Sequence, residues 1–167
     1  MITEPHHPTE DPLASKRLTL PARLRALMAA AATRAYPAEA CGLLVGRASG
    51  SRVEVVRVAK ARNRATTPTR YDLDPEDFVA ADLAARNEGL DIVGIWHSHP
   101  DHPAIPSQTD LDRAWSGYSY VILSIRHGKE EELRSWRLED GGFREELLEN
   151  GSHRIHTADT PVEAIET

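Results

Sequence analysis

The sequence has only one cysteine, Cys41, among its 167 residues. A single cysteine excludes an intrachain disulfide, and it also excludes the structural zinc sites that use two or more cysteines. We therefore expect a reducing compartment. Residues 1–17 have no basic start followed by an apolar run, which indicates that no secretory signal is present. The sequence predicts a cytoplasmic protein.

Positive charge is also scarce, with 20 Lys and Arg against 26 Asp and Glu and a formal net charge of −6. Because a nucleic-acid ligand requires a basic face, we expect no nucleic-acid partner. No stretch approaches the roughly 18 consecutive apolar residues of a membrane span, so we expect no membrane partner. The length suits one globular domain, and the sequence leaves the oligomeric state open.

Hydrophobic periodicity divides the chain into strands and helices. Apolar or alternating patterns predict strands at residues 17–20, 41–47, 52–61, 91–99, 119–125, 132–138 and 142–148. Helical spacing and capping residues predict helices at 21–36, 75–89 and 107–115. This mixed order predicts an α+β fold with a curved mixed β-sheet flanked by helices. We expect one domain over residues 17–148, between flexible polar tails at 1–16 and 149–167.

Residues 97–110, HSHPDHPAIPSQTD, concentrate potential metal ligands between prolines. His97 and His99 end a predicted strand, so their side chains point to the same face. Asp110 stands at the start of the predicted helix 107–115, which the loop could fold back over the histidines. Together the three residues match the three protein ligands of a catalytic zinc, whose fourth position stays open for water. Each feature also has an ordinary interpretation. A His-x-His pair is common in strands, and Ser107 with Asp110 forms a capping-box pattern.

A hydrolytic metal site also needs a group that accepts a proton. Glu39 stands between two alanines ahead of the predicted strand 41–47, where it is less well solvated than on an open helix face. From there it could accept a proton from water and deliver it to a leaving amine. Taken alone, Glu39 is more simply interpreted as a polar residue in a helix-to-strand turn.

Taken together, Glu39, the His97-Ser-His99-Pro sequence and Ser107-x-x-Asp110 resemble the JAMM motif of MPN-domain (Mov34/PAD-1-like) metallopeptidases. The resemblance covers roughly residues 17–148. It is nearest to the short bacterial members that act on small ubiquitin-like sulfur-carrier proteins.

The resemblance implies a single MPN-type, cytidine-deaminase-like domain with one Zn²⁺ per chain, bound by His97, His99 and Asp110. It implies that Glu39 acts as general base and then general acid. It also implies that Ser107 hydrogen-bonds the oxyanion that forms when the amide is attacked.

The function that follows is a zinc metallopeptidase that hydrolyses a peptide or isopeptide bond at the C-terminal end of a small ubiquitin-like or sulfur-carrier protein. A non-catalytic metal-binding MPN scaffold and a broad small-peptide hydrolase without a protein partner are the alternatives. Among the remaining residues, we expect His102 to be exposed in its loop and Cys41 to be buried by packing. Trp96 should face away from the metal, because it alternates with His97.

Overall fold

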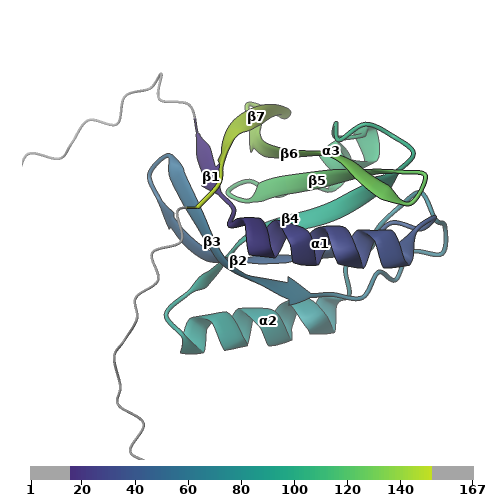
Figure 1. Ribbon diagram of the computed structural model, residues 1–167. Coiled ribbons are helices and arrows are strands. Elements are labelled where there is room, and N and C mark those ends of the chain that lie inside the picture. Colours follow the sequence, from purple (N-terminus) through teal and green to yellow (C-terminus); the bar gives the residue numbers. More distant parts are fainter. Residues whose placement is uncertain (1–15, 152–167) are drawn as a thin grey trace, which may run out of the picture.

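The computed structural model describes residues 16–151 of the chain (Figure 1). The strands are β1 (Arg17–Thr19), β2 (Cys41–Ser49), β3 (Arg52–Lys60), β4 (Asp91–Pro100), β5 (Ser119–Arg126), β6 (Lys129–Glu139) and β7 (Gly142–Glu149). The helices are α1 (Ala22–Ala35), α2 (Pro75–Asn87) and α3 (Gln108–Arg113). All the predicted strands and helices are present, with ends at most three residues from their predicted positions. The predicted tails lie almost wholly outside the described residues.

The seven strands form a closed barrel in the order β1-β3-β2-β4-β5-β6-β7. The prediction of a curved sheet is therefore wrong in one respect, because the two edges of the sheet meet. The barrel closes through β1, which runs parallel to both β3 and β7. Leu18 at its centre pairs with Val53 on one side and Leu148 on the other, and it is fully buried. An alternating pattern identifies a strand but not its neighbours, so the sequence holds no local signal for this closure. The predicted mixed character is confirmed, because β4 and β5 are also parallel.

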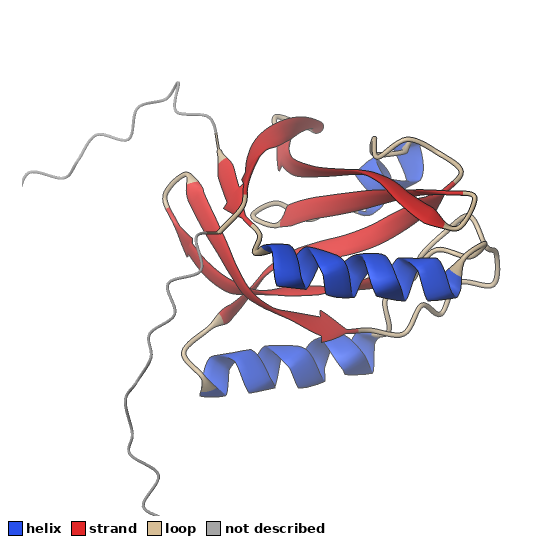
Figure 2. Cartoon of the chain, viewed as in Figure 1, coloured by secondary structure: helices blue, strands red, loops and turns tan. Residues whose placement is uncertain are grey.

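The side chains of the central strands face two separate cores. One core packs the strands against α1, whose residues Leu24, Met28 and Ala32 recur every fourth position. The other core packs them against α2 through Ala81 and Ala85. Strands β2 and β4 therefore lie between the two long helices (Figure 1), while Figure 2 shows the short helix α3 apart from both. None of the helices in residues 16–151 is long and apolar enough to cross a membrane.

Strand β4 is buried along residues 92–99 because β2 and β5 flank it. Trp96 is buried in the α1 core, as predicted. Its indole lies so close to Gly42 that a Cβ added there would come within 2.4 Å of the indole Nε1. Alternate residues of a strand face opposite sides, so His97 points to the same side as Ile95, which packs in the α2 core. The histidines therefore lie on the α2 side of β4.

Segment 62–74 joins β3 to α2 and is tied to the start of the helix. Asp74 caps α2 by accepting hydrogen bonds from two backbone N–H groups of the first turn, and Pro75 occupies the first helical position, as predicted. Arg62 forms ion pairs with Asp74 at 3.3 Å and with Asp77 at 3.0 Å. These contacts anchor both ends of the segment beside α2.

Candidate metal centre

Strand β4 brings His97 and His99 together near its C-terminal end. The ring centroids are 4.9 Å apart, and the two Nε2 atoms are 3.0 Å apart. His97 is fully buried and His99 is 7% exposed. The pair therefore lies where water has almost no access, with both Nε2 atoms directed at a common point.

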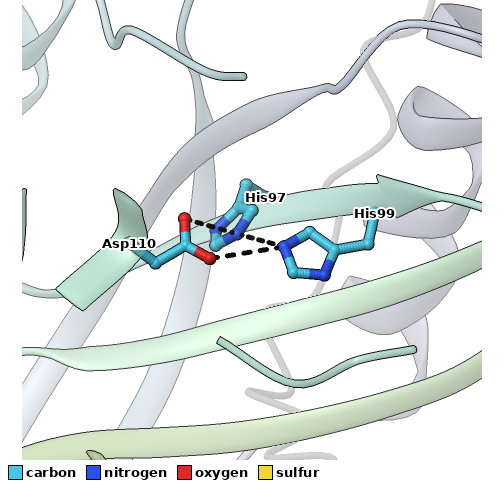
Figure 3. A group of neighbouring side chains, drawn as sticks. All are labelled: His97, His99 and Asp110. Atoms are coloured by element: carbon cyan, nitrogen blue, oxygen red, sulfur yellow. Dashed lines mark hydrogen bonds and ion pairs between the residues drawn. The ribbon is translucent and has the colours of Figure 1, made fainter. Parts of the chain in front are cut away.

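Helix α3 supplies the third group. Asp110 Oδ1 lies 3.3 Å from His97 Nε2, and Asp110 Oδ2 lies 3.4 Å from His99 Nε2 (Figure 3). The potential ligand atoms of the three residues all lie within 4.8 Å of one another. The structure thus brings together the three residues that the sequence marked as metal ligands, in a geometry that could hold a metal ion.

The chemistry of this group of donors fits zinc. His99 Nδ1 lies 2.8 Å from the carbonyl oxygen of Pro103. A carbonyl oxygen can only accept, so Nδ1 carries the proton and donates it. In the neutral ring, Nε2 is then left with a free lone pair facing Asp110. A backbone carbonyl that orients the second ring nitrogen is typical of metal-binding histidines.

The electrostatics of the cluster keep its carboxylate ionised. Burial acts to raise the pKa of Asp110, but its interactions with His97 and His99 outweigh burial and hold that pKa well below its usual range. Burial lowers the pKa of His97, which favours its neutral form, and Asp110 opposes this only in part. Burial also acts to lower the pKa of His99, but Asp110 and the Pro103 carbonyl outweigh burial and raise that pKa, so a metal ion at His99 Nε2 would compete with a proton. A carboxylate and a neutral imidazole are the states in which these side chains bind a metal.

Glu39 reaches the site from the loop before β2. Its neighbour Ala40 is bound to β4 through Ser98, which lies between the two histidines. Ala40 N–H donates to Ser98 Oγ at 2.9 Å, and Ser98 N–H donates to the Ala40 carbonyl at 3.0 Å. Glu39 is therefore held beside the cluster, and it is 9% exposed.

The environment of Glu39 favours its protonated form. Burial raises the pKa of Glu39 from 4.5 to about 7, the nearby His99 lowers it in part, and the charge of Asp110 raises it further. A pKa near neutrality suits a group that must accept a proton and later release it. Glu39 lines one cleft, of about 360 Å³, together with His99, Ser107, Thr69, Pro100 and Ile105.

Ser107 is the N-cap of α3, and the predicted capping box is formed. Its Oγ accepts from Asp110 N–H at 3.1 Å, while Asp110 Oδ2 accepts from Ser107 N–H at 2.7 Å and from Ser107 Oγ at 2.8 Å. The cap therefore also orients the Asp110 carboxylate toward the histidines. Ser107 is exposed on the cleft, where a substrate oxygen can reach its hydroxyl.

Several residues that shape the site were not found from the sequence. Ser98 lies between the two histidines, and its hydroxyl binds the backbone N–H of Ala40, the residue just before β2. This contact aligns β2 with β4. Tyr71 stacks on the ring of His97, with centroids 4.4 Å apart and an interplanar angle of 24°. Asn63 binds the carbonyl of Glu39 at 2.9 Å. These contacts join distant segments and leave no local pattern in the sequence.

Two other predictions about single residues are confirmed. His102 is exposed and Cys41 is buried.

A family described as prokaryotic homologs of the JAB domain matches residues 21–139. The chain belongs to this family. The resemblance to JAMM/MPN metallopeptidases that the motif indicated is thereby confirmed.

Two curated relatives of this JAB-family chain carry the names of enzymes. A Haloferax volcanii protein named desampylase is 42% identical over 90 residues, which are 53% of this chain and 63% of that protein. The match thus spans less than two thirds of that relative. The CysO-cysteine peptidase of Mycobacterium tuberculosis is 37% identical over 130 residues, which are 77% of this chain and 88% of that protein.

A solved structure supports the fold of this JAB domain. The solution structure of a protein from Desulfitobacterium hafniense has a TM-score of 0.73 and 33% sequence identity to this chain. It covers 84% of this chain and 96% of its own. The neighbour therefore matches nearly the whole described domain.

Replacement of Ser107 by Ala should destabilise the protein, because the substitution removes both hydrogen bonds of the Ser107 hydroxyl with Asp110. We expect the free energy of unfolding to fall by about 1 kcal/mol, as for other lost N-caps. Urea denaturation of the metal-free chain measures this. Ser107→Thr keeps the hydroxyl and serves as the control, so an equal loss in both variants would contradict the capping role.

Proposed function

We propose that this chain is a zinc metallopeptidase, and that it hydrolyses a peptide or isopeptide bond at the C-terminal end of a small ubiquitin-like or sulfur-carrier protein. One observation carries the proposal. A buried glutamate with a pKa raised to about 7 lies in the same cleft as His99, beside the His97–His99–Asp110 cluster. We assign the activity to a single domain over residues 17–148.

His97, His99 and Asp110 would hold the zinc ion. When bound, zinc supplies a Lewis acid that polarises the substrate carbonyl and makes water more acidic. Glu39 accepts a proton from the water that attacks the amide carbon and then delivers it to the leaving nitrogen as the C–N bond breaks. The Ser107 hydroxyl donates to the carbonyl oxygen as that oxygen gains negative charge. During this step the hydroxyl turns away from Asp110 Oδ2.

The cleft and its surroundings support a carrier protein as substrate. Thr69, Pro100 and Ile105 give the cleft uncharged walls, which suit an extended tail of small residues lying beside segment 62–74. Beyond Tyr71, the large apolar side chains of Val79 and Leu83 on α2 are 65% and 61% exposed. Exposed apolar surface of this kind is typical of a protein-binding face. The names of the two curated relatives point to the same substrate class.

The alternatives make different demands on the site. A metal-binding scaffold needs His97, His99 and Asp110 but has no use for Glu39, which burial makes costly to ionise. A broad small-peptide hydrolase needs the whole cleft but no apolar surface beyond it. Zinc binding, the effect of replacing Glu39 and the choice of substrate separate the three possibilities.

The cluster should bind one zinc ion per chain. Elemental analysis of untagged protein, purified without chelator, measures the stoichiometry. His97→Ala and Asp110→Ala should abolish binding, because each removes a ligand. His102→Ala should retain it, because His102 is an exposed residue outside the cluster. A stoichiometry near zero that added zinc does not restore would count against the catalytic proposal.

Replacement of Glu39 by Gln should abolish hydrolysis while fold and zinc binding persist. The amide keeps the shape of the side chain but cannot accept a proton, so we expect kcat to fall at least ~100-fold. Glu54→Gln, which changes an exposed glutamate of β3, is the matched control and should retain full activity. Equal turnover by Glu39→Gln and the parent would remove Glu39 from the mechanism.

Glu39→Gln should also change how stability depends on pH. The pKa of Glu39 is raised in the folded state, so between pH 4.5 and about 7 the folded chain holds a proton that the unfolded chain has lost. The stability of the parent therefore falls as pH rises through this window. Gln carries no charge to bury, so above pH 7 the variant should unfold at the same or a higher urea concentration than the parent.

The substrate class can be tested with two sets of substrates. One is a sulfur-carrier protein extended by one or two residues beyond its C-terminal Gly-Gly, and the other is free short peptides with the same end sequence. We expect mass spectrometry to show trimming of the carrier and little cleavage of the peptides. Comparable cleavage of both would overturn the carrier-specific proposal and leave a broad hydrolase.

A further inference from the structure

Both backbone groups of Glu39 are bound to segment 62–74. Glu39 N–H donates to the carbonyl of Pro68 at 3.0 Å. The Glu39 carbonyl accepts from Asn63 Nδ2 at 2.9 Å. Within residues 16–151, hydrogen bonds fix the backbone of Glu39 but not its carboxylate. The position of the carboxylate therefore depends on how firmly this segment holds the backbone.

Asn63 in turn determines the shape of the segment. Its second Nδ2 hydrogen is donated to the Arg70 carbonyl at 3.0 Å. Its Oδ1 accepts from Ala65 N–H at 2.9 Å and from Asp72 N–H at 2.8 Å. An asparagine side chain offers two donor hydrogens and one oxygen with two lone pairs, so Asn63 uses its full capacity. This single amide links both sides of the loop to the residue before β2.

The same loop reaches the metal cluster and the cleft. Tyr71, next to two of the groups that Asn63 binds, stacks on the ring of His97 at 4.4 Å. Thr69 lines the cleft with Glu39. A backbone bridge between Asn63 and Leu73 closes the base of the loop. The loop is therefore one wall of the site, and Asn63 lies at its centre.

We propose that Asn63 is a positioning residue of the reaction, whose side-chain amide holds the backbone of Glu39 and the Tyr71 wall in place opposite the His97–His99–Asp110 cluster. This inference rests on the proposed peptidase function. A proton acceptor must lie within hydrogen-bond reach of the attacking water, and a misplacement of about 1 Å can lower the rate ~100-fold. Asn63 does not line the cleft and is not part of the His97–His99–Asp110 cluster, so we infer that it acts through Glu39.

Two substitutions separate positioning from general stability. Asn63→Asp keeps the size and both accepting interactions, but it puts an oxygen where the NH₂ group bound Glu39 and Arg70. Asn63→Ala removes all four hydrogen bonds. The matched control is Arg62→Ala, which breaks the neighbouring ties to Asp74 and Asp77.

Activity on the extended carrier is measured per folded, zinc-loaded chain. For both Asn63 variants we expect kcat to fall at least ~10-fold while KM changes less than ~3-fold, because the base is displaced and the substrate is still bound. Zinc affinity, measured by competition with a chelator, should stay within ~3-fold of the parent, because all three ligands remain.

The pH dependence of kcat adds a measurement that would not change if Asn63 only stabilised the fold. The acid limb of kcat should shift to higher pH in Asn63→Asp, where a new negative charge lies near Glu39. It should shift to lower pH in Asn63→Ala, where Glu39 gains access to water. Unchanged kcat and acid limb in both variants, or an equal loss in Arg62→Ala, would overturn the inference. If Asn63→Ala does not fold, Asn63→Asp decides alone by the same criteria.

Failure of the proposed function can be distinguished from failure of this inference. If the parent does not cleave the carrier, the proposed function fails. The Glu39 carboxyl can still be followed by carbon-13 NMR in the full zinc-loaded chain. A pKa of Glu39 in an Asn63 variant equal to that in the parent would then overturn the positioning role, and a shift in the directions given above would support it.

Discussion

Two imidazoles and a carboxylate are held within 4.8 Å of one another at a nearly buried position. The surrounding structure pairs most of their polar atoms, although His97 Nδ1 is buried without a hydrogen-bond partner among the described residues. Buried polar groups are costly unless they are paired. The Asp110 carboxylate is therefore bound by the N–H and hydroxyl of Ser107, and the outer nitrogen of His99 by the Pro103 carbonyl. Strand β4 can carry the two histidines at this depth only because β2 and β5 flank it on both sides. The barrel thus serves as a rigid frame for three side chains.

The two segments beside the cluster are loops, yet side-chain hydrogen bonds hold both of them in place. Segment 62–74 folds around the Asn63 amide. The loop after β4 is held from two other strands, because Ser124 Oγ donates to the His102 carbonyl at 2.7 Å and Trp136 Nε1 donates to the Ala104 carbonyl at 3.0 Å. Prolines stiffen the same loop. Functional groups on loops need this kind of support, since a site that is loose by 1 Å loses most of its rate. Hydrogen bonds therefore fix both walls of the cleft, one from within the loop and the other from the barrel strands β5 and β6.

Local features of the fold and site could be predicted from the sequence, whereas long-range ones could not. Alternation and capping residues identify every strand and helix, and the spacing of His97, His99 and Asp110 identifies a possible metal centre. Closure of the barrel by β1 depends on a three-residue strand that pairs with Val53 and Leu148, far away in the chain. The Asn63 contact with Glu39 likewise joins residues 24 positions apart. A periodic pattern indicates which face of a helix or strand a side chain lies on, but not which distant segment that face contacts. Such contacts can be identified only from the three-dimensional structure.

Glu39 is the residue in which stability and function conflict. Its carboxylate is nearly buried and, within residues 16–151, has no hydrogen bond that would offset the loss of water. An uncharged residue of similar shape would fit this position at a lower cost in folding free energy. A desolvation cost of this kind is expected where a reaction needs a group with a shifted pKa, because proteins tolerate local destabilisation at functional sites. A metal site that only stabilised the fold would require nothing of position 39. The costly carboxylate beside three residues that could hold a metal ion is therefore the strongest physical argument that the site is catalytic.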